Sequence, residues 1–291
     1  MGPAHRSAHS AGSALATIPS PSALSPSPPL RSEKTPDNPG VLQRRIVAAP
    51  LSLLIWASYV IIVIVWTPLV FLYRLLTFPF DPDRYRLGRF FRNSAVLAGN
   101  INPFWKFRIV DDVHPDPRRP YVFVSNHSSN ADAFAIVRLP WEMKLLFKRS
   151  LLRIPLLGWQ LLIAGDVPIV RGNKESARVA MEELKRWLAR RVSVFFFPEG
   201  TRSPDGSLGP FREGAFRLAI EAGVDVVPLA ISGAGQGLPK HSFIFQPTTA
   251  TLTVLPPVST KGLSAADAPR LAAEIREVIA RSLEAAPVEP T

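Results

Sequence analysis

The sequence predicts a single α/β domain with a mixed, largely parallel sheet flanked by helices, preceded by an N-terminal membrane helix or helical hairpin. In the second half of the chain, short apolar or β-branched runs alternate with helix-like segments, a pattern typical of α/β domains. Upstream of them lies an uncharged apolar run long enough to cross a bilayer. We therefore divide the chain into a tail at 1–40, a membrane-associated helical segment at 41–100 and the α/β domain at 101–291.

The tail at residues 1–40 is rich in Pro and Ser and carries few apolar residues beyond scattered Ala and Leu. Such a composition buries too little apolar surface to offset the entropy lost on ordering. We expect this tail to be disordered. It does not resemble a signal peptide, because the apolar segment begins only after residue 45.

The apolar segment runs from Ile46 to Tyr73 without a charged residue, and about 20 residues suffice to span a hydrocarbon core. Arg44 and Arg45 precede it and several arginines follow it, whereas a simple span carries its basic excess on one side. Pro68 also interrupts the run. Two interpretations stay open: a kinked or re-entrant hairpin with both ends in the cytoplasm, and a single crossing. Either predicts a protein of the inner or plasma membrane, with its active site facing the cytoplasm.

The strands of the predicted sheet are short runs of apolar and β-branched residues. These runs are Phe104–Val110, Tyr121–Val124, Met143–Phe147, Asp166–Val170, Val192–Phe197, Val226–Ile231 and Ala250–Leu255. Pro228 interrupts the run at Val226–Ile231. Because proline in a strand favours an edge or a bulge, we expect this strand to line a groove and not the centre of the sheet.

Helices are predicted between these strands, at Ala131–Leu139, Lys174–Arg190, Glu213–Ala222 and Ala265–Ala285. The second is the clearest. Its apolar residues recur at intervals of three or four, which indicates one buried helical face.

The net charge of +11 and the pI near 10.5 indicate an anionic partner: nucleic acid, a phospholipid surface or a phosphorylated substrate. Much of the arginine excess lies beside the apolar segment, where anionic headgroups account for it. We therefore expect a phospholipid membrane as partner and no nucleic acid. The chain has no cysteine and neither an EF-hand loop nor an HExxH motif, so we expect no protein-bound metal.

The stretch "NHSSNADAF", Asn126 to Phe134, follows a predicted strand directly. It places His127 at the end of that strand and Asp132 five residues later. Imidazole exchanges protons near neutral pH and suits a general base, while a carboxylate can hold its tautomer and stabilise the imidazolium. The alternative is a solvated loop histidine followed by an aspartate that caps the next helix. This stretch alone leaves both interpretations open.

Three further stretches lie at strand ends, where α/β folds usually place their sites. They are "GDVPIVRG" (Gly165–Gly172), "FFFPEGTRS" (Phe195–Ser203) and "VVPLAISG" (Val226–Gly233). Within the second, Gly200 would let the backbone approach a ligand closely, and Arg202 offers a planar fork suited to phosphate. The alternative for this stretch is a turn with a surface ion pair.

In this order and spacing, the four stretches resemble those of the glycerolipid acyltransferase family, whose archetype is 1-acyl-sn-glycerol-3-phosphate (lysophosphatidic acid) acyltransferase. The resemblance covers Trp105–Leu255, and Leu146–Trp159 is similar to the family's linker between its first two motifs. One residue departs from the pattern: Pro168 stands in the second motif where the family usually has an aromatic side chain, at the acceptor pocket.

The resemblance implies transfer of a fatty acyl group from a thioester donor, acyl-CoA or acyl-carrier-protein, to the free hydroxyl of 1-acylglycerol-3-phosphate, which gives phosphatidic acid for phospholipid biosynthesis. No cofactor is implied. By resemblance, His127 would be the catalytic base and Asp132 its orienting carboxylate. The residues implied in substrate binding are Arg171, Glu199, Gly200, Thr201, Arg202 and, more weakly, Lys148.

Other functions stay open at this point. The same chemistry could serve another lyso-lipid acceptor, in lysophospholipid remodelling or lyso-ornithine lipid synthesis. A membrane lipid-binding protein could also keep this fold without catalysis, although such a role would not need the His127/Asp132 pair. A Gly-x-Gly-x-Gly string at Gly233–Gly237 runs into Pro239 and not into a helix, so it does not predict dinucleotide binding. No Gly-x-Ser-x-Gly string of a serine hydrolase is present.

Overall fold

The computed structural model describes residues 39–111, 113–203, 206–238 and 242–285, with side chains from residue 48 onward. Gly40–Thr291 form one compact unit. The predicted disordered tail lies outside the described residues, except for its last two, which begin the first helix. The functional division of the chain near residue 100 stays a prediction.

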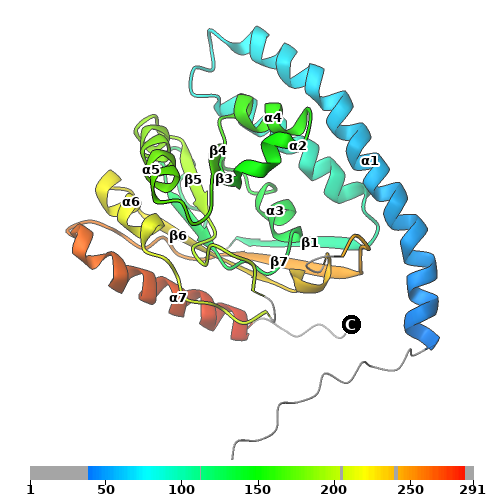
Figure 1. Ribbon diagram of the computed structural model, residues 1–291. Coiled ribbons are helices and arrows are strands. Elements are labelled where there is room, and N and C mark those ends of the chain that lie inside the picture. The colour runs from blue at the N-terminus through cyan, green and yellow to red at the C-terminus, as the bar shows by residue number, and fades with distance from the viewer. Residues whose placement is uncertain (1–38, 112, 204–205, 239–241, 286–291) are drawn as a thin grey trace, which may run out of the picture. The chain divides into compact units, whose positions relative to one another are not determined.

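The described residues contain a seven-stranded mixed sheet with the order β1-β7-β6-β2-β5-β3-β4 (Figure 1). Its strands are β1 (Trp105–Asp111), β2 (Val122–Ser125), β3 (Met143–Lys148), β4 (Val167–Ile169), β5 (Ser193–Phe196), β6 (Val226–Ser232) and β7 (Thr248–Val254). Neighbouring strands are parallel except for β6 and β7, which are antiparallel. The predicted mixed, largely parallel sheet is confirmed.

The predicted helices are present, joined by others that the sequence did not single out. The helices are α1 (Pro39–Thr77), α2 (Tyr85–Ile101), α3 (Ala131–Ile136), α4 (Leu157–Ala164), α5 (Lys174–Ala189), α6 (Gly214–Ala222) and α7 (Ala268–Ala285), with 3-10 turns η1 (Arg149–Arg153), η2 (Ala234–Gln236) and η3 (Ala265–Asp267). Local capping fixes two of them. Asn173 accepts the N–H of Ser176 at the start of α5, and a Ser264–Asp267 capping box precedes α7. Helices α2 and α4 are the additions.

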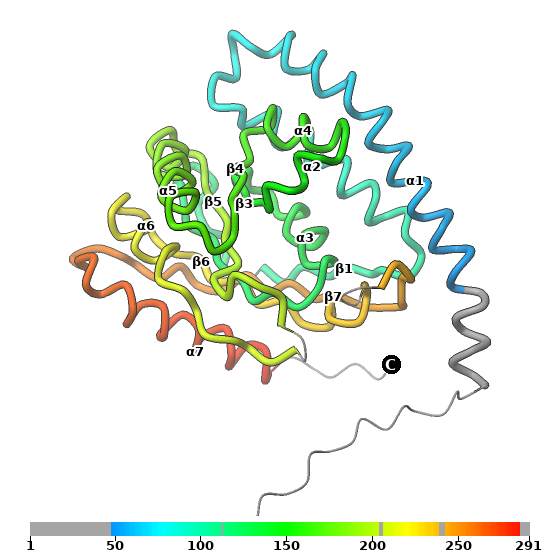
Figure 2. Tube along the Cα trace, in the orientation of Figure 1, coloured from blue at the N-terminus to red at the C-terminus, as the bar shows by residue number. Residues whose placement is uncertain are grey.

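Both faces of the sheet are covered, as the continuous apolar runs of its central strands require. Alternate residues of β2 point to opposite sides: Val122 and Val124 belong to a core with α5, α6 and α7, and Phe123 belongs to a second core with α1 and α3. Figure 2 follows the chain through these layers. The strand ends between the two layers are therefore fixed on both sides.

The expectation that the Pro228 strand lines a groove and not the centre of the sheet is wrong, because β6 lies inside the sheet between β2 and β7. Leu255 donates to the Pro228 carbonyl, and two residues earlier Val226 exchanges both of its bonds with Val258. The missing N–H of Pro228 therefore points to the β7 side. The regular β6–β7 pairing begins only at the next residue, Leu229, so the proline lies at the end of this pairing and not within it.

The segment Ile46–Tyr73 lies within α1, which is continuous through Pro50 and Pro68. It therefore contains no internal hairpin. Within the described residues, Ala48–Thr77 is long and apolar enough to cross a membrane, with a mean hydropathy of 2.3. Only 17% of its most apolar window is buried, so α1 is not a core helix of the domain. The chain reverses after Thr77, and α2 then packs against α1, where Trp66 and Tyr73 both stack on Phe90.

One face of α1 is bound to the domain between Ser52 and Val63. Phe245 N donates to Ser52 Oγ at 3.0 Å, and the Trp56 indole donates to the Phe243 carbonyl at 2.9 Å. Two turns further on, the amide of Gln160 in α4 donates to Val63 O at 3.0 Å. The opposite face exposes large apolar side chains, among them Leu53, Leu54, Val60, Ile61, Ile64, Leu72 and Leu75.

A buried ionic cluster joins α2 to the sheet. The Arg92 guanidinium in α2 donates to both carboxylate oxygens of Asp166, at 2.6 and 3.0 Å. Lys144 of β3 donates to Glu142 at 2.9 Å and to the Ala164 carbonyl at 2.8 Å. Burial raises the pKa of Glu142 and lowers that of Lys144, and the opposite charge of each opposes this shift. Two cations and two carboxylates thus compensate one another without solvent.

Candidate active site

The predicted site residues gather at one edge of the sheet. Strands β2, β5, β3 and β4 are parallel neighbours, so their carboxyl ends lie at the same edge. His127 follows β2, Glu199 follows β5, Lys148 ends β3 and Arg171 follows β4. The topology therefore brings together residues that lie as many as 72 positions apart in sequence, as His127 and Glu199 do.

His127 and Asp132 are in direct contact: Nδ1 of the ring lies 2.8 Å from Oδ2 of the carboxylate. The same oxygen accepts the backbone N–H of Ser128 at 2.7 Å and of Ser129 at 2.8 Å. Because an ionised carboxylate only accepts, Nδ1 carries the hydrogen and Nε2 keeps a lone pair. The histidine is thus oriented with one nitrogen bound to Asp132 and the other available to take a proton.

The alternative of a solvated histidine and a helix-capping aspartate does not describe this geometry. Only 13% of the His127 side chain and none of the Asp132 side chain is exposed. Asp132 is the second residue of α3, and its carboxylate receives N–H groups from the turn before the helix. These hydrogen bonds close the turn between the strand and the helix, and they place the Asp132 carboxylate next to the His127 ring.

The main chain and ring of His127 are held from β5 as well. The His127 N–H donates to Oε1 of Glu199 at 2.8 Å, and the ring stacks on Phe197 with centroids 3.8 Å apart and 15° between the planes. Next to it, Asn126 joins β2 to β6, since its amide exchanges two 2.8 Å bonds with the backbone of Ile231. The first two residues of the motif therefore tie the strand end to both neighbouring strands.

Both carboxylate oxygens of Glu199 accept hydrogen bonds from backbone N–H groups. Oε1 accepts from His127, and Oε2 accepts the N–H of Gly209 at 3.2 Å. An added Cβ at Gly209 would lie 3.1 Å from that oxygen, so a larger residue there would press on the carboxylate. The carboxylate thus joins the histidine to the loop that follows the motif.

Gly200 has a left-handed backbone, with φ of 74°, which favours glycine. The space that a Cβ would occupy is filled by the Arg212 guanidinium, whose Cζ would lie 2.9 Å away. Within the described part of the chain, the guanidinium groups of Arg212 and Arg202 have no hydrogen-bond partner. Arg202 is half-buried, whereas Thr201, Arg171 and Lys148 are exposed.

A small hollow opens beside His127. It is lined by Asn126, His127, Ser128, Glu199, Ser203, Gly206, Ser207, Leu208 and Leu283. The last of these comes from α7, so the C-terminal helix reaches the site. The sequence analysis did not identify Phe197, Arg212 or α7 as parts of the site, although Arg212 follows the "EGTR" string closely enough to have been a candidate.

Known proteins resemble this chain in sequence and in fold. A family model described as Acyltransferase matches residues 106–232. A human 1-acyl-sn-glycerol-3-phosphate acyltransferase beta is 32% identical over 191 residues, covering 63% of this chain and 69% of that protein. The chain therefore belongs to the glycerolipid acyltransferase family, and its relatives are of the 1-acyl-sn-glycerol-3-phosphate acyltransferase type.

Other relatives carry the same description. A 1-acyl-sn-glycerol-3-phosphate acyltransferase of Chlamydomonas reinhardtii is 33% identical over 75% of this chain, and a chloroplastic one of Brassica napus is 39% identical over 55% of it. The chain spans 64% and 47% of their lengths. The crystal structure of the acyltransferase PlsC from Thermotoga maritima shares the fold, with a TM-score of 0.68 and 24% identity, over 84% of this chain and 100% of that one.

Proposed function

We propose that the protein is a membrane-bound O-acyltransferase that moves a fatty acyl group from a thioester donor to the free hydroxyl of 1-acyl-sn-glycerol-3-phosphate, giving phosphatidic acid. The oriented His127–Asp132 pair carries this proposal. A lipid-binding protein would have no use for a buried carboxylate aimed at a histidine ring. The relatives are described as 1-acyl-sn-glycerol-3-phosphate acyltransferases, which supports 1-acyl-sn-glycerol-3-phosphate as the acceptor.

The proposed reaction needs no acyl-enzyme. Nε2 of His127 takes the proton of the acceptor hydroxyl as its oxygen attacks the thioester carbonyl. The tetrahedral intermediate collapses, the C–S bond breaks, and the imidazolium returns the proton to the departing thiolate. Asp132 stabilises the imidazolium between the two transfers, as the aspartate does in serine proteases. The products are the new ester and the free thiol of CoA or of acyl-carrier-protein.

Cations near the histidine would bind the acceptor phosphate. Arg202 and Arg212 belong to the same turn region after β5, where Arg212 lies over Gly200, and neither guanidinium has a hydrogen-bond partner among the described residues. Guanidinium forks match phosphate oxygens in pairs. Arg171 and Lys148, exposed at the ends of the next strands, would complete a basic rim. Both oxygens of Glu199 already accept backbone N–H groups, so we assign it no contact with phosphate.

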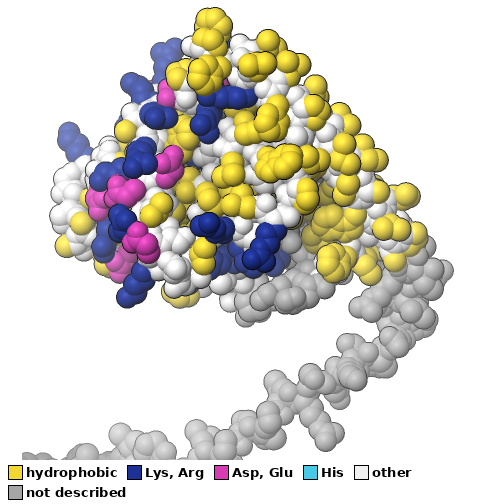
Figure 3. Space-filling model, turned by 45° about the horizontal axis from the view of Figure 1, so that its top comes forward, with side chains coloured by type: hydrophobic (Ala, Val, Ile, Leu, Met, Phe, Trp, Pro, Cys, Tyr) yellow, Lys and Arg dark blue, Asp and Glu magenta, His cyan; other side chains and the backbone are white. Residues whose placement is uncertain are grey.

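The two faces of α1 suggest how the protein meets the membrane. A helix crossing a bilayer has lipid around it at its middle, but α1 is bound to the domain at Ser52, Trp56, Val63 and Thr67. We propose that α1 lies along the membrane with its opposite, apolar face in the lipid, which leaves both chain ends on the cytoplasmic side. Figure 3 shows hydrophobic side chains gathered over the α1 side of the molecule.

The function is tested by supplying purified protein in phospholipid vesicles with labelled acyl-CoA or labelled acyl-carrier-protein. The acceptors are the lyso forms of phosphatidic acid, phosphatidylcholine, phosphatidylethanolamine and ornithine lipid. We expect labelled phosphatidic acid, and at least about a hundredfold less of it per unit time from the His127→Ala protein. Product from a different acceptor would keep the chemistry and replace the substrate. Binding of lyso-lipid without product from any acceptor would favour the non-catalytic function.

A further inference from the structure

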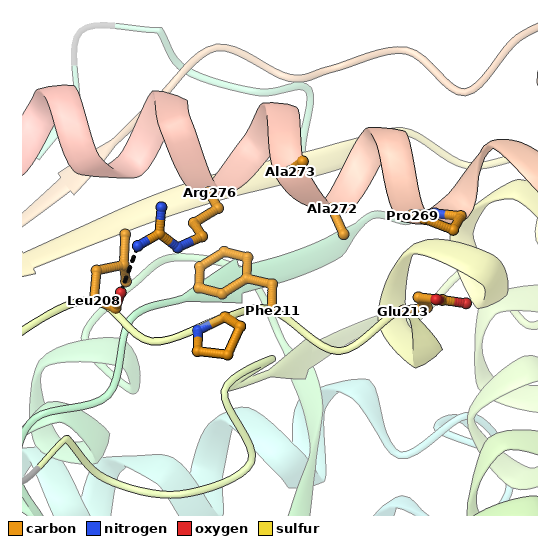
Figure 4. Close-up of a pocket in the computed structure, with 8 residues that line it drawn as sticks. Leu208, Phe211, Glu213, Pro269, Ala272, Ala273 and Arg276 are labelled. Carbon is orange, nitrogen blue, oxygen red and sulfur yellow. Dashed lines mark hydrogen bonds between the residues drawn. The ribbon is translucent and has the colours of Figure 1, made fainter. Parts of the chain in front are cut away.

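A loop runs from the active site along the C-terminal helix. Ser203, just beyond the "EGTR" string, donates its N–H to the His127 carbonyl at 2.8 Å, and Leu208 lines the hollow beside the histidine. The loop then passes under α7 as far as Glu213, where α6 begins. Figure 4 shows Leu208, Phe211 and Glu213 on this loop, facing Arg276, Ala273, Ala272 and Pro269 of α7.

Arg276 connects the helix to this loop. Its Nη2 donates to the Leu208 carbonyl at 2.6 Å and its Nε to the Gly209 carbonyl at 2.9 Å. No carboxylate pairs with it in the described ranges, whereas Arg270 and Arg281 on the same helix form surface ion pairs. The charged guanidinium of Arg276 therefore donates to two neutral backbone carbonyls. Such charge-assisted hydrogen bonds are strong and directional.

Loop and helix meet around an open hollow of about 350 Å³, lined mostly by apolar side chains including Pro210, Phe211 and Ala272. Leu208 and Phe211 also pack against the core to which α7 contributes. The two Arg276 bonds add directional polar contacts to this packing, and they act on the backbone carbonyls of Leu208 and Gly209.

Hydrogen bonds of Gly209 and Glu199 connect this loop to His127. Gly209, whose carbonyl accepts from Arg276, donates its N–H to Oε2 of Glu199 at 3.2 Å. Oε1 of Glu199 accepts the N–H of His127 at 2.8 Å. At one end of this series of contacts Arg276 lies on α7, and at the other His127 follows the central strand β2.

We propose that Arg276 is a positioning residue for the active site: it fixes the Leu208–Gly209 carbonyls, and through Gly209 and Glu199 it holds His127 in its working orientation. This role rests on the proposed acyltransferase function. It also assigns a part in the site to α7, which lies outside the residues matched by the family model. The base itself remains His127, and Arg276 touches no reacting atom.

The kinetic test compares Arg276→Met and Arg276→Lys with Arg281→Met, a matched arginine of the same helix whose ion pair faces solvent. We expect Arg276→Met to lower kcat about tenfold, because small misplacements of catalytic groups are costly. The KM values for acceptor and donor should change much less. Lysine can bind one carbonyl at a time, so Arg276→Lys should recover part of kcat. Arg281→Met should match the wild type.

A double-mutant cycle separates positioning from a general loss of folding. If Arg276 acts through Glu199, Arg276→Met should add little in the Glu199→Gln background, whereas independent effects multiply. The same tenfold loss in both backgrounds would overturn the proposal, as would an Arg276→Met enzyme with wild-type kcat. Should Arg276→Met fail to fold, the same cycle is made with Arg276→Lys.

A second readout needs no substrate and so is independent of the proposed function. Diethyl pyrocarbonate modifies accessible imidazoles, and peptide mass spectrometry reports each histidine separately. Releasing the loop should raise the modification rate of His127 severalfold in Arg276→Met and leave it unchanged in Arg281→Met. His114, which is 78% exposed, is the internal reference. An unchanged His127 rate in Arg276→Met would overturn the positioning role even if the chain acylates no lyso-lipid.

Discussion

Oδ2 of Asp132 lies 2.8 Å from Nδ1 of His127 and is held in that place by two backbone N–H groups of the intervening turn. The carboxylate is therefore fixed before any substrate binds. A buried oxygen with three donors cannot turn away to solvent without leaving them unsatisfied. The pair is preorganised for proton transfer, and it is where we expect the largest kinetic effects.

Replacing His127 with Ala removes the proposed base. We expect turnover to fall by about two to four orders of magnitude, the usual worth of general-base catalysis, with binding of lysophosphatidic acid retained. Initial rates and equilibrium binding to acceptor-loaded vesicles measure both effects. A His127→Ala enzyme that keeps more than about a tenth of wild-type turnover would exclude the general-base role.

Asp132→Asn keeps the shape and removes the charge. An amide cannot stabilise the imidazolium, and its NH2 group favours the wrong ring tautomer. We expect turnover to drop strongly, and the His127→Ala/Asp132→Asn double variant to lose little beyond His127→Ala, because the two residues act as one unit. Turnover rates of the two single variants and of the double variant, each compared with the wild type, test this expectation. Losses that multiply in the double variant would mean that Asp132 acts apart from the histidine.

Arg202→Lys keeps the charge at the proposed phosphate site but loses the guanidinium fork. We expect a higher KM for lysophosphatidic acid with the donor KM nearly unchanged. Arg217→Lys is the control, since Arg217 forms a surface pair with Glu213 on α6. Steady-state kinetics with each substrate varied in turn give both parameters. Equal damage to donor and acceptor KM would point to a role in the fold.

Local sequence predicted most of the sheet and the helices correctly, because continuous apolar strands and amphipathic helices such as α5 are recognisable by period and composition. It also placed His127 and Asp132 together, since the turn between them is short. It missed contacts that depend on strand order. The expectation that the Pro228 strand avoids the centre of the sheet failed, because nothing local reveals that β6 lies between β2 and β7.

The contacts that sequence could not show join segments that are distant along the chain. Arg276 lies 67 residues beyond Gly209, and Arg92 lies 74 residues before Asp166. A surface arginine and a buried one look alike in sequence, because burial is decided by which elements pack together. The continuity of α1 was also hidden, since Pro68 normally favours a break and is tolerated here inside a long apolar helix.

Arg92→Met tests the buried cluster. It leaves Asp166 and Glu142 without their shared guanidinium in a site where Arg92 is only 4% exposed. Breaking a buried ion pair from one side typically costs about 3–5 kcal/mol, and we expect a loss of this order in the free energy of unfolding measured by urea in detergent. Arg186→Met is the control, because its pair with Glu183 lies on the surface. Equal stability of the two variants would show that the cluster does not anchor α2.

The orientation of α1 is tested by changing one of its faces. Leu54, Ile61 and Leu72 are exposed on the outer face, while Ile55 and Val70 of the inner face are buried. Removing a buried Leu or Ile from lipid costs roughly 1.5–3 kcal/mol, so changing all three to Gln should shift the protein from the membrane pellet toward the supernatant without unfolding it. Ile55→Gln should instead destabilise the fold.

Terminal reporters then decide between the two topologies. A helix that lies along the membrane keeps both ends on one side, so reporters fused to the N- and C-termini should both be cytoplasmic. A single crossing puts them on opposite sides, and it would require α1 to leave the contacts that Trp56 and Gln160 make between helix and domain. Reporters on opposite sides of the membrane would therefore contradict an α1 that lies along the membrane. Full membrane retention of the triple Gln variant would contradict it as well.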